Sequence, residues 1–483
     1  MKSLTLGLLE RLPLARVVLM CWSFVMDDAF LEELFEQHRG AGYRRKLGFA
    51  TLVGLIRDAL LAREAGARRT FERARAGGRM AVSVAAAYGK LSRVSLGLSR
   101  ALLREGARQL VGLMPAADHW AAPASLAGLD LVCCDGKTIK HVPHRLKPTR
   151  AVRGRLLGGK LQVAQDMRSG LAVAMNACED AERNEVRLTE GLVEQVVPAG
   201  HPGRPGRRPI LWVSDRQYSD LRMPRLFTRD GGGHFLIRYN RTLGFAADPR
   251  RPASEGTDAR GRRWVQEWGW VGAEGRPDRL YVRRITLYRP DVPQDGDVIL
   301  ITDLLDERLY PADDLLECYL HRWGIEKMFQ QVTEVFDLRH LIGTTPRAAI
   351  FQSAFCLMLY NIIQVIRGYV AADGGLAGEE VSGHKLFGDV RRELTAWSVL
   401  GGDDDPQATL AALATPRSPA QMRTRLRELL HWDDLWRKSK PRARPSVGGR
   451  TTHARGGRSS VYKLLQAARD GPPRPARRTP ARC

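Results

Sequence analysis

The spacing of apolar residues along the chain changes from a helical period to short strand-like runs. Within the first 115 residues or so, apolar side chains recur at helical spacing, as at Phe30, Leu31, Leu34 and Phe35. Clusters of Arg and Lys lie between and after these segments, which is typical of a helical DNA-binding module and equally of solvated helix faces. We therefore predict an all-helical N-terminal DNA-binding region at 1–115.

The pattern from 116 to 436 predicts a second, α/β domain. One apolar run ends at Asp135, a hairpin pattern surrounds Arg168-Ser169-Gly170, an amphipathic segment follows, and another apolar run ends at Asp215. A strand, a hairpin, a helix, a strand, a helix and a strand in this order predict a mixed sheet, because the early strands are linked by a hairpin. Strand-like runs at about 241–301 predict a β-rich insertion. Helices are expected to dominate from Asp313 to about Trp436, including a helical C-terminal part at about 346–436.

The most apolar stretch, 349–366, is long enough to raise the question of a membrane span. It carries four polar residues in about 18, which favours a buried helix. These residues are Gln352, Ser353, Asn361 and Gln364. We therefore expect a soluble protein without a membrane partner.

Charge narrows the choice of partner. The chain has 76 Lys and Arg against 53 Asp and Glu, a formal net charge of +23. The segment 437–483, rich in Pro, Gly and Arg, contains 14 of these cations and a single acid, so we predict a disordered basic tail. Nucleic acid is the commonest polyanion for such a surface, and an anionic membrane is the alternative. Seven scattered cysteines without a Cys-x-x-Cys pair favour reduced thiols and a cytoplasmic location.

Polar residues at three separate places could form one site. Asp135 and Asp215 each end a predicted central strand, where open α/β sheets place their ligand groups, although Asp after a strand is also ordinary in turns. On a helix with about 100° per residue, Tyr319, Arg322, Glu326 and Thr333 fall in one narrow wedge. This wedge borders the apolar stripe, so the helix can pack on the sheet while holding these side chains over its end.

With these motifs in this order, the chain resembles bacterial insertion-sequence transposases of the DDE class, in the group with a Tyr-x2-Arg-x3-Glu-x6-Lys signature. Tyr319, Arg322 and Glu326 match that signature within YLHRWGIEKMFQQV, and CCDGKTIK and WVSDRQYSD resemble the first and second Asp motifs. The resemblance covers about residues 28–370. The position of the signature Lys is occupied by Thr333, whose hydroxyl can still bond to a phosphate oxygen.

The resemblance implies an RNase H-like mixed sheet flanked by helices, with the β-rich insertion before the helix of the catalytic Glu. It implies Asp135, Asp215 and Glu326 as catalytic residues and as ligands of two Mg²⁺ ions, for which Mn²⁺ can substitute. Tyr319, Arg322 and the position of Thr333 are expected to contact DNA. Trp268 and Trp270, in the insertion, are candidates for stacking on a flipped base, although alternate Trp residues on a strand can simply pack on one face.

The expected function is a DNA transposase that nicks the ends of its own mobile element, through a hairpin intermediate, and joins the freed 3′ hydroxyls to new DNA. The partners would be double-stranded DNA, as terminal inverted repeats and target, and a second copy of the chain when two ends are synapsed. The location would be the bacterial cytoplasm, at the nucleoid. The alternative is a catalytically impaired, sequence-specific DNA-binding relative, in which the acidic residues form a structural salt-bridge network with Arg.

Overall fold

A computed structural model describes residues 4–40, 46–61, 66–116, 119–197, 208–229, 232–289, 296–335, 341–400, 413, 415–439 and 458–470. The N-terminal part is helical, as predicted, with Asp27 and Ser95 capping two of the helices through their side chains. Its helices are α1 (Leu4–Leu9), α2 (Pro13–Val25), α3 (Asp28–His38), α4 (Phe49–Leu61), α5 (Gly66–Ala76), α6 (Val84–Leu91) and α7 (Leu96–Val111).

The centre of the molecule is one mixed sheet, which confirms the predicted α/β class. Its strands are β1 (Asp130–Val142), β2 (Arg155–Asp166), β3 (Ala172–Cys178), β4 (Ile210–Ser214), β5 (Gly233–Arg238), β6 (Phe245–Ala247), β7 (Ser254–Thr257), β8 (Arg263–Val271), β9 (Leu280–Leu287), β10 (Val298–Thr302) and β11 (Arg458–Ser460). The order is β11-β2-β1-β4-β5-β10-β9-β8-β6, with β3 also on β2 and β7 on β8. The pairs β1–β4, β4–β5 and β11–β2 are parallel and the others are antiparallel.

The remaining helices are α8 (Thr189–Val196), α9 (Arg222–Phe227), α10 (Ala312–His321), α11 (Trp323–Val335), α12 (Pro346–Asp373), α13 (Gly383–Leu400), α15 (Pro419–Leu429) and α16 (Val461–Asp470). Helices α10 to α12 cover one face of the sheet and α8 and α9 the other, while α13 and α15 pack on other helices. Short 3₁₀ turns lie at η1 (Ala124–Leu126), η2 (Lys147–Thr149), η3 (Glu185–Leu188), η4 (Arg216–Tyr218), η6 (Arg241–Leu243), η7 (Gly378–Glu380) and η8 (Asp434–Trp436).

Side chains alternate along the central strands between two buried clusters. Leu131 and Cys133 of β1 join the larger cluster with residues of α10, α11 and α12, whereas Val132 and Cys134 join the smaller one with residues of α8 and α9. The odd-numbered positions of β1 therefore face α10–α12. By the same alternation, the side chain of Asp135 belongs to that face.

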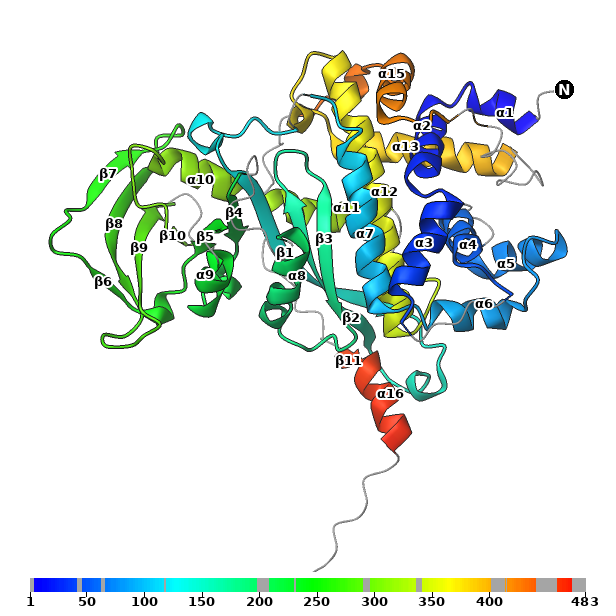
Figure 1. The fold of residues 1–483 in the computed structure, drawn as a ribbon, viewed down its shortest axis with the longest axis horizontal. Coiled ribbons are helices and arrows are strands. Elements are labelled where there is room, and N and C mark those ends of the chain that lie inside the picture. Colours follow the sequence, from blue (N-terminus) through cyan, green and yellow to red (C-terminus); the bar gives the residue numbers. More distant parts are fainter. Residues whose placement is uncertain are drawn as a thin grey trace, which may run out of the picture.

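Helix α12 passes through the middle of the molecule (Figure 1). It is the one described helix long and apolar enough to cross a membrane, and its apolar window is completely buried inside the protein. Three of the four polar residues noted in the sequence have partners there: Asn361 bonds to both the N–H and the C=O of Ala172 on β3, Gln352 accepts from the N–H of Ile342, and Ser353 donates to a C=O within the helix. The side-chain amide of Gln364 is buried without a hydrogen-bond partner among the described residues. The prediction of a buried helix is confirmed.

The expected domain boundary at residue 115 does not separate two cores. Helix α7 packs on β3 and α12, and one apolar cluster contains side chains from α2 to α7 as well as from the sheet. The insertion likewise does not form a separate unit, because β10 pairs with both β5 and β9 and so continues the central sheet. Figure 1 shows these strands at one end of the molecule and α1 to α6 at the other.

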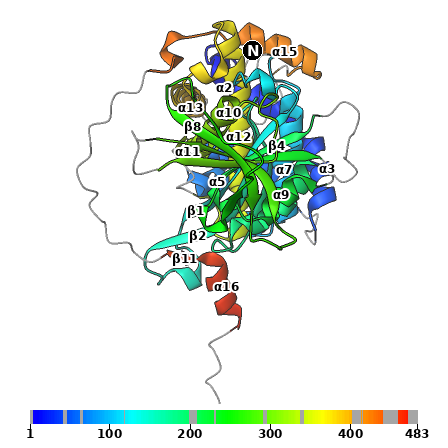
Figure 2. The ribbon, with the colours of Figure 1, turned by 90° about the vertical axis from the view of Figure 1, so that its left-hand side faces the viewer.

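The basic tail differs in part from the disorder expected for 437–483. Residues Arg458–Ser460 form β11, which adds to the edge of β2 in parallel, and α16 follows directly. The two views agree that α16 lies at that end of β2 (Figures 1 and 2). Val461 is buried against the core, which gives this short segment an anchor. The tail residues 440–457 and 471–483 lie outside the described residues.

Candidate active site

Asp135 and Asp215 are neighbours because of the parallel register of β1 and β4. The last paired residues of the two strands are Cys134 and Ser214, and each Asp is the next residue along its strand. Residues at matching positions of parallel neighbours lie about 4.8 Å apart and point to the same face. The structure therefore brings together the two carboxylates that the sequence placed at the ends of separate strands.

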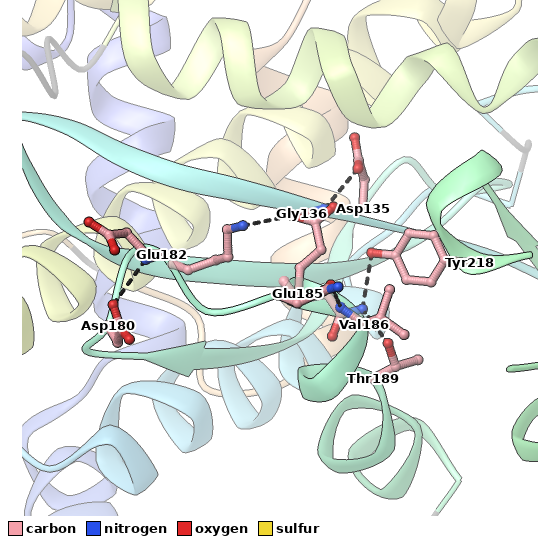
Figure 3. A network of polar contacts seen from close by, with 11 residues as sticks. Asp135, Gly136, Asp180, Glu182, Glu185, Val186, Thr189 and Tyr218 are labelled. Atoms are coloured by element: carbon pink, nitrogen blue, oxygen red, sulfur yellow. Dashed lines mark hydrogen bonds and ion pairs between the residues drawn. The ribbon is translucent and has the colours of Figure 1, made fainter. Parts of the chain in front are cut away.

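The surroundings of Asp135 differ from the predicted strand end, since β1 continues through it to Val142 and pairs with β2 as far as that residue. The Oδ1 atom of Asp135 accepts a hydrogen bond from the N–H of Gly136 at 2.8 Å. Gly136 leaves room for the carboxylate of Glu185, because a Cβ there would lie 2.2 Å from it and the side chain of Glu185 would have to shift. Figure 3 shows Glu185 approaching Gly136 from one side of the strand while the side chain of Asp135 extends on the other.

The helix expected to carry Tyr319, Arg322 and Glu326 is broken into α10 and α11. Arg322 lies between them, and the turn is tightened by bonds from the N–H of Arg322 to the C=O of Tyr319 and from the N–H of Ile325 to the C=O of Arg322. The three side chains nevertheless converge. The Tyr319 hydroxyl donates to Oδ1 of Asp215 at 3.3 Å, and Nη2 of Arg322 donates to Oε1 of Glu326 at 3.1 Å.

Arg322 is the electrostatic centre of this group. It is 3% exposed, and its Nε and Nη1 atoms are buried without a hydrogen-bond partner among the described residues. Burial alone would lower the pKa of Arg322, but Tyr319, Asp215, Asp135 and Glu326 together raise it above its usual value. The three acidic side chains therefore all act on one guanidinium group.

Burial also acts on the acids. It raises the pKa of Asp135 to about 6, with further increases from Glu185 and Glu326, while the Gly136 N–H and Arg322 work in the opposite direction. Burial, aided by the charge of Asp215, raises the pKa of Tyr319 to about 12, so the hydroxyl keeps its proton at neutral pH. A pKa near 6 means that burial disfavours the ionised form of the Asp135 carboxyl, and a cation bound beside it would stabilise that form.

The acidic side chains of this site meet part of the needs of a divalent metal ion. Among the described residues, no three or more His, Cys, Asp and Glu side chains are grouped closely enough to hold one. Asp135 and Asp215 do fit part of such a site: both are oxygen donors, they lie on adjacent strands, and neither forms an ion pair with a described Lys, Arg or His. Glu326 is engaged by Arg322 instead, as a structural salt bridge would be.

Thr333 lies two turns further along α11 and is half-buried. Its hydroxyl donates to the C=O of Phe329 at 2.7 Å, a bond within the helix. The side chain therefore follows the helix and places no cation at this position.

The two Trp residues of the insertion have different surroundings. Trp268 is 2% exposed, its Nε1 donates to the C=O of Leu305, and the guanidinium of Arg251 lies 3.9 Å from its ring centroid. This is the packing described above as the alternative to base stacking. Trp270 is half-buried and packs edge-on against Tyr281, with Arg279 at 5.1 Å from its ring.

Glu185 and Gly136 are parts of the site that the sequence patterns did not single out. Glu185 is 7% exposed and lies 3.4 Å from Nζ of Lys160. In the sequence it is one acid at the start of an amphipathic segment, and Asp135-Gly136 has the composition of a turn. The signal that could have identified them is a Gly inside a strand, which often marks the close approach of another group.

A family of known proteins matches the part of the chain that contains this site. Residues 127–362 match the family described as "Transposase DDE domain". This range runs from just before β1 into α12 and includes Asp135, Asp215, Tyr319, Arg322 and Glu326. The match supports a DDE transposase, a class of enzymes that cut and join DNA.

A solved structure of piggyBac transposase, in a synaptic complex with hairpin DNA, is similar over 90% of this chain and 87% of that one, at 8% identity and a TM-score of 0.40. No curated protein matches the chain.

Proposed function

We propose that this protein is a DNA transposase with an RNase H-like catalytic sheet, which nicks the ends of its own element and joins the 3′ hydroxyls to new DNA. The observation that supports this most is the register of β1 and β4, which puts Asp135 and Asp215 side by side beneath Tyr319, Arg322 and Glu326. Residues separated by about 190 positions in the chain meet on one face of the sheet beside the carboxyl end of β4, and the carboxyl ends of strands are where ligand groups of open α/β folds are found.

In this proposal Asp135, Asp215 and Glu326 are the catalytic residues and hold divalent metal. Two Mg²⁺ ions, or Mn²⁺ in their place, would activate the attacking oxygen and stabilise the leaving oxygen of the phosphodiester. Asp135 and Asp215 supply the adjacent pair of oxygen donors, and Glu326 is the third donor, currently bonded to Arg322.

The remaining residues bind and orient the DNA. Arg322 presents buried N–H groups that lack partners, and such groups bond well to phosphate oxygens. Tyr319 is fixed by its bond to Asp215 and keeps its proton, so it remains a donor at neutral pH. In the first step water attacks the phosphorus at the element end and the 3′ oxygen leaves as a hydroxyl. That hydroxyl then attacks the opposite strand, which forms a hairpin on the element end and releases the 3′ hydroxyl of the flanking DNA. A second water opens the hairpin and restores the 3′ hydroxyl of the element, which attacks a phosphate of the target DNA and displaces a 3′ hydroxyl there.

The assembly follows from the same proposal. Two element ends must be held together, so the working form is a homodimer on DNA with inverted repeats. The net charge of +23 supports DNA as the partner, and α1 to α7 with the basic tail are the regions we assign to its binding. The site of action would be the bacterial nucleoid, in the cytoplasm.

The test uses the full chain and a duplex that carries the inverted repeats flanking its gene. Asp135→Ala, Asp215→Ala and Glu326→Ala should each lower Mg²⁺- or Mn²⁺-dependent nicking by about 10³-fold or more while binding of the duplex stays within about twofold. Asp220→Asn is the matched control, because Asp220 follows the same strand but pairs with Arg222 on the surface. A triple variant that nicks as fast as the parent would refute the assignment.

A specific observation favours a second candidate, the catalytically impaired DNA-binding relative. Glu326 is bonded to Arg322, and Thr333 occupies the position of the signature Lys. In that case the parent chain would bind the inverted repeats specifically and show no nicking with either metal ion.

A further inference from the structure

A second site is present on the opposite side of the α10–α11 junction. A cavity of about 350 Å³ lies there, lined by residues of α10, α11, α12, the start of α13 and the segment after η8. The residues of the junction alternate: Tyr319, Arg322 and Glu326 face the candidate active site, whereas His321, Trp323 and Lys327 line the cavity. The cavity is therefore separate from the acidic site but shares one helical wall with it.

The cavity is strongly basic. Among the described residues that line it, Lys327, Arg367 and Lys438 carry permanent positive charges, and Glu379 is the one carboxylate. Glu379 lies 4.0 Å from His321, at the edge of ion-pair distance. The cations that line the cavity therefore outnumber its carboxylates: Lys327 and Lys438 are exposed to solvent, Glu380 also acts on Lys438, and Arg367 is the cation that is buried. A buried cation is stabilised when an anion binds beside it.

Arg367 forms the floor of the cavity. It projects from α12 and is 8% exposed, so the side chain is more than nine-tenths buried. Its Nη2 donates to the C=O of Val381 at 2.6 Å, while Nε is buried without a hydrogen-bond partner among the described residues. A buried donor without an acceptor is unusual in a folded protein and indicates a missing ligand or water.

Two helices begin at the same cavity. Trp323 and Gly324 open α11, and Gly383 and His384 open the 18-residue helix α13, and all four line the space. The first turn of a helix carries partial positive charge and free N–H groups, so both helices add to the attraction for an anion.

Burial shifts the pKa values of two groups that line the cavity. Burial lowers the pKa of Arg367 to about 10. Burial, together with the charges of Lys327, Lys438 and Arg367, lowers the pKa of His321 to about 4. The imidazole of His321 is therefore neutral at pH 7, stacked on Trp120 with the ring centroids 4.0 Å apart, and it leaves Lys and Arg as the cations of the cavity.

We propose that this cavity binds a phosphoryl group, held by Arg367 at the floor and by Lys327 and Lys438 at the rim. The volume admits a group as large as a nucleotide. The phosphoryl group can come from the DNA backbone or from a free phosphate compound, since the chemistry of recognition is the same. Because α10 and α11 carry residues of both sites, an anion here would also brace the junction that positions Arg322.

The test measures binding directly and needs no catalysis, so its result does not depend on the proposed transposase activity. Inorganic phosphate and dAMP are titrated into the full chain by calorimetry, and a duplex oligonucleotide is titrated by fluorescence anisotropy. The double variant Lys327→Gln/Lys438→Gln should weaken phosphate and dAMP binding about tenfold or more, because two charge-assisted contacts are removed. Both side chains are at the exposed rim, so the fold should persist, as circular dichroism would check.

The control is Lys147→Gln, which removes an exposed Lys from η2, outside the cavity, and should leave binding within about twofold. If duplex DNA displaces dAMP from the parent and the double variant also binds DNA more weakly, the phosphoryl group is that of the DNA backbone. If dAMP stays bound under saturating duplex, it is that of a free compound. Equal phosphate, dAMP and duplex affinities in the parent, the double variant and the control would overturn the proposal.

Discussion

Two buried arginines, one on the sheet and one between two helices that cover it, differ in how completely their neighbours satisfy their charge and hydrogen bonds. Arg283, in the insertion, is fully buried and donates to Oε1 of Gln266 at 2.8 Å and to the C=O of Tyr310 at 2.6 Å. Arg322, beside the candidate active site, is also buried and donates to Glu326, but its Nε and Nη1 atoms have no hydrogen-bond partner among the described residues. The first arginine is satisfied by its neighbours and the second is not.

The pKa values of the two groups differ in the same sense. Burial lowers the pKa of Arg283 to about 10, because its acceptors are mostly neutral. The pKa of Arg322 is raised against the effect of burial, because Tyr319 and three acids surround it. A buried charge whose neighbours complete its hydrogen bonds contributes structure, whereas one that draws acids together and keeps free donors is prepared for a ligand.

The comparison is tested most strongly by Arg322→Met, which removes the guanidinium and keeps most of its volume. We expect DNA nicking to fall by about 10²- to 10³-fold, as when a single preorganised donor is removed from an active site. The unfolding free energy should fall less than in the corresponding Arg283 variant, because the acids around Arg322 are half-buried and can reach water. Nicking rates and denaturant unfolding of the same preparations provide the measurement.

Arg322→Lys serves as the control for this prediction. It restores the charge without the planar fork, so it should recover part of the DNA binding and little of the nicking. Full activity in Arg322→Met would contradict the role assigned to Arg322.

The second prediction concerns the other arginine. Arg283→Met should lower the unfolding free energy by about 3 kcal/mol or more, because Gln266 and the C=O of Tyr310 would lose a charged donor inside the protein. The nicking rate per folded molecule should change little. The neighbouring Arg284→Met is the matched control: Arg284 pairs with Glu267 at the half-buried surface, and its loss should cost about 1 kcal/mol or less. Equal losses of stability in the two variants would remove the distinction drawn for Arg283.

The sequence predicted the individual helices and strands of this fold better than the contacts between segments that are distant in the chain. The hairpin between β2 and β3 follows from Arg168-Ser169-Gly170, since Gly170 takes a positive φ of 73° there. The helices of the N-terminal part and the burial of α12 follow from apolar spacing in the same way. These features depend on neighbouring residues, so a pattern in the sequence contains most of their cause.

The features that depend on distant segments were predicted less well. The Asp135-Gly136 pair has turn composition, but β1 continues through it because the long pairing with β2 and the approach of Glu185 favour an extended backbone. The break between α10 and α11 lies at Arg322, and an Arg at that position does not predict the end of a helix as a Pro or Gly would. Trp268 is covered because the insertion extends the central sheet and Arg251 and the segment at Leu305 fold over it, which alternation along one strand cannot reveal.

The third prediction uses the burial of Asp135. Its pKa is about 6 in the folded protein and near 4 when the chain is unfolded, so the folded state holds the proton more tightly. The stabilising contribution is therefore complete below about pH 4 and is lost as the pH rises through 6. In the absence of metal, the parent must ionise the buried Asp135 as the pH rises, whereas Asp135→Asn has no such cost. The variant should therefore gain stability relative to the parent between pH 4 and 6, by at most about 3 kcal/mol.

Thermal unfolding of the two proteins in chelator, at steps from pH 4 to pH 8, would measure this difference. It should grow up to about pH 6 and stay level above. Asp220→Asn is again the comparison, because the bonds to Arg222 lower the pKa of Asp220, and its loss should therefore not stabilise the protein at any pH in this range. A difference for Asp135→Asn that is constant over pH would show that the carboxyl of Asp135 is already hydrated in the folded state.

The smallest expected effect separates a local contact from net charge. Thr333→Lys places a cation on the wedge of α11 that carries Glu326, where the hydroxyl now bonds only within the helix. One added phosphate contact should tighten duplex binding by about three- to tenfold at low salt. The slope of the logarithm of the binding constant against the logarithm of salt concentration should become steeper by about one, because about one more counterion is released. Thr424→Lys is a closely matched control, because Thr424 makes the same type of bond to the residue four before it, but on α15. If the two variants tighten binding equally, the gain is due to net charge, and position 333 makes no contact with the DNA backbone. If Thr333→Lys alone tightens binding, residue 333 lies beside the DNA backbone. If the metal concentration needed for nicking is also unchanged, this position takes no part in holding metal.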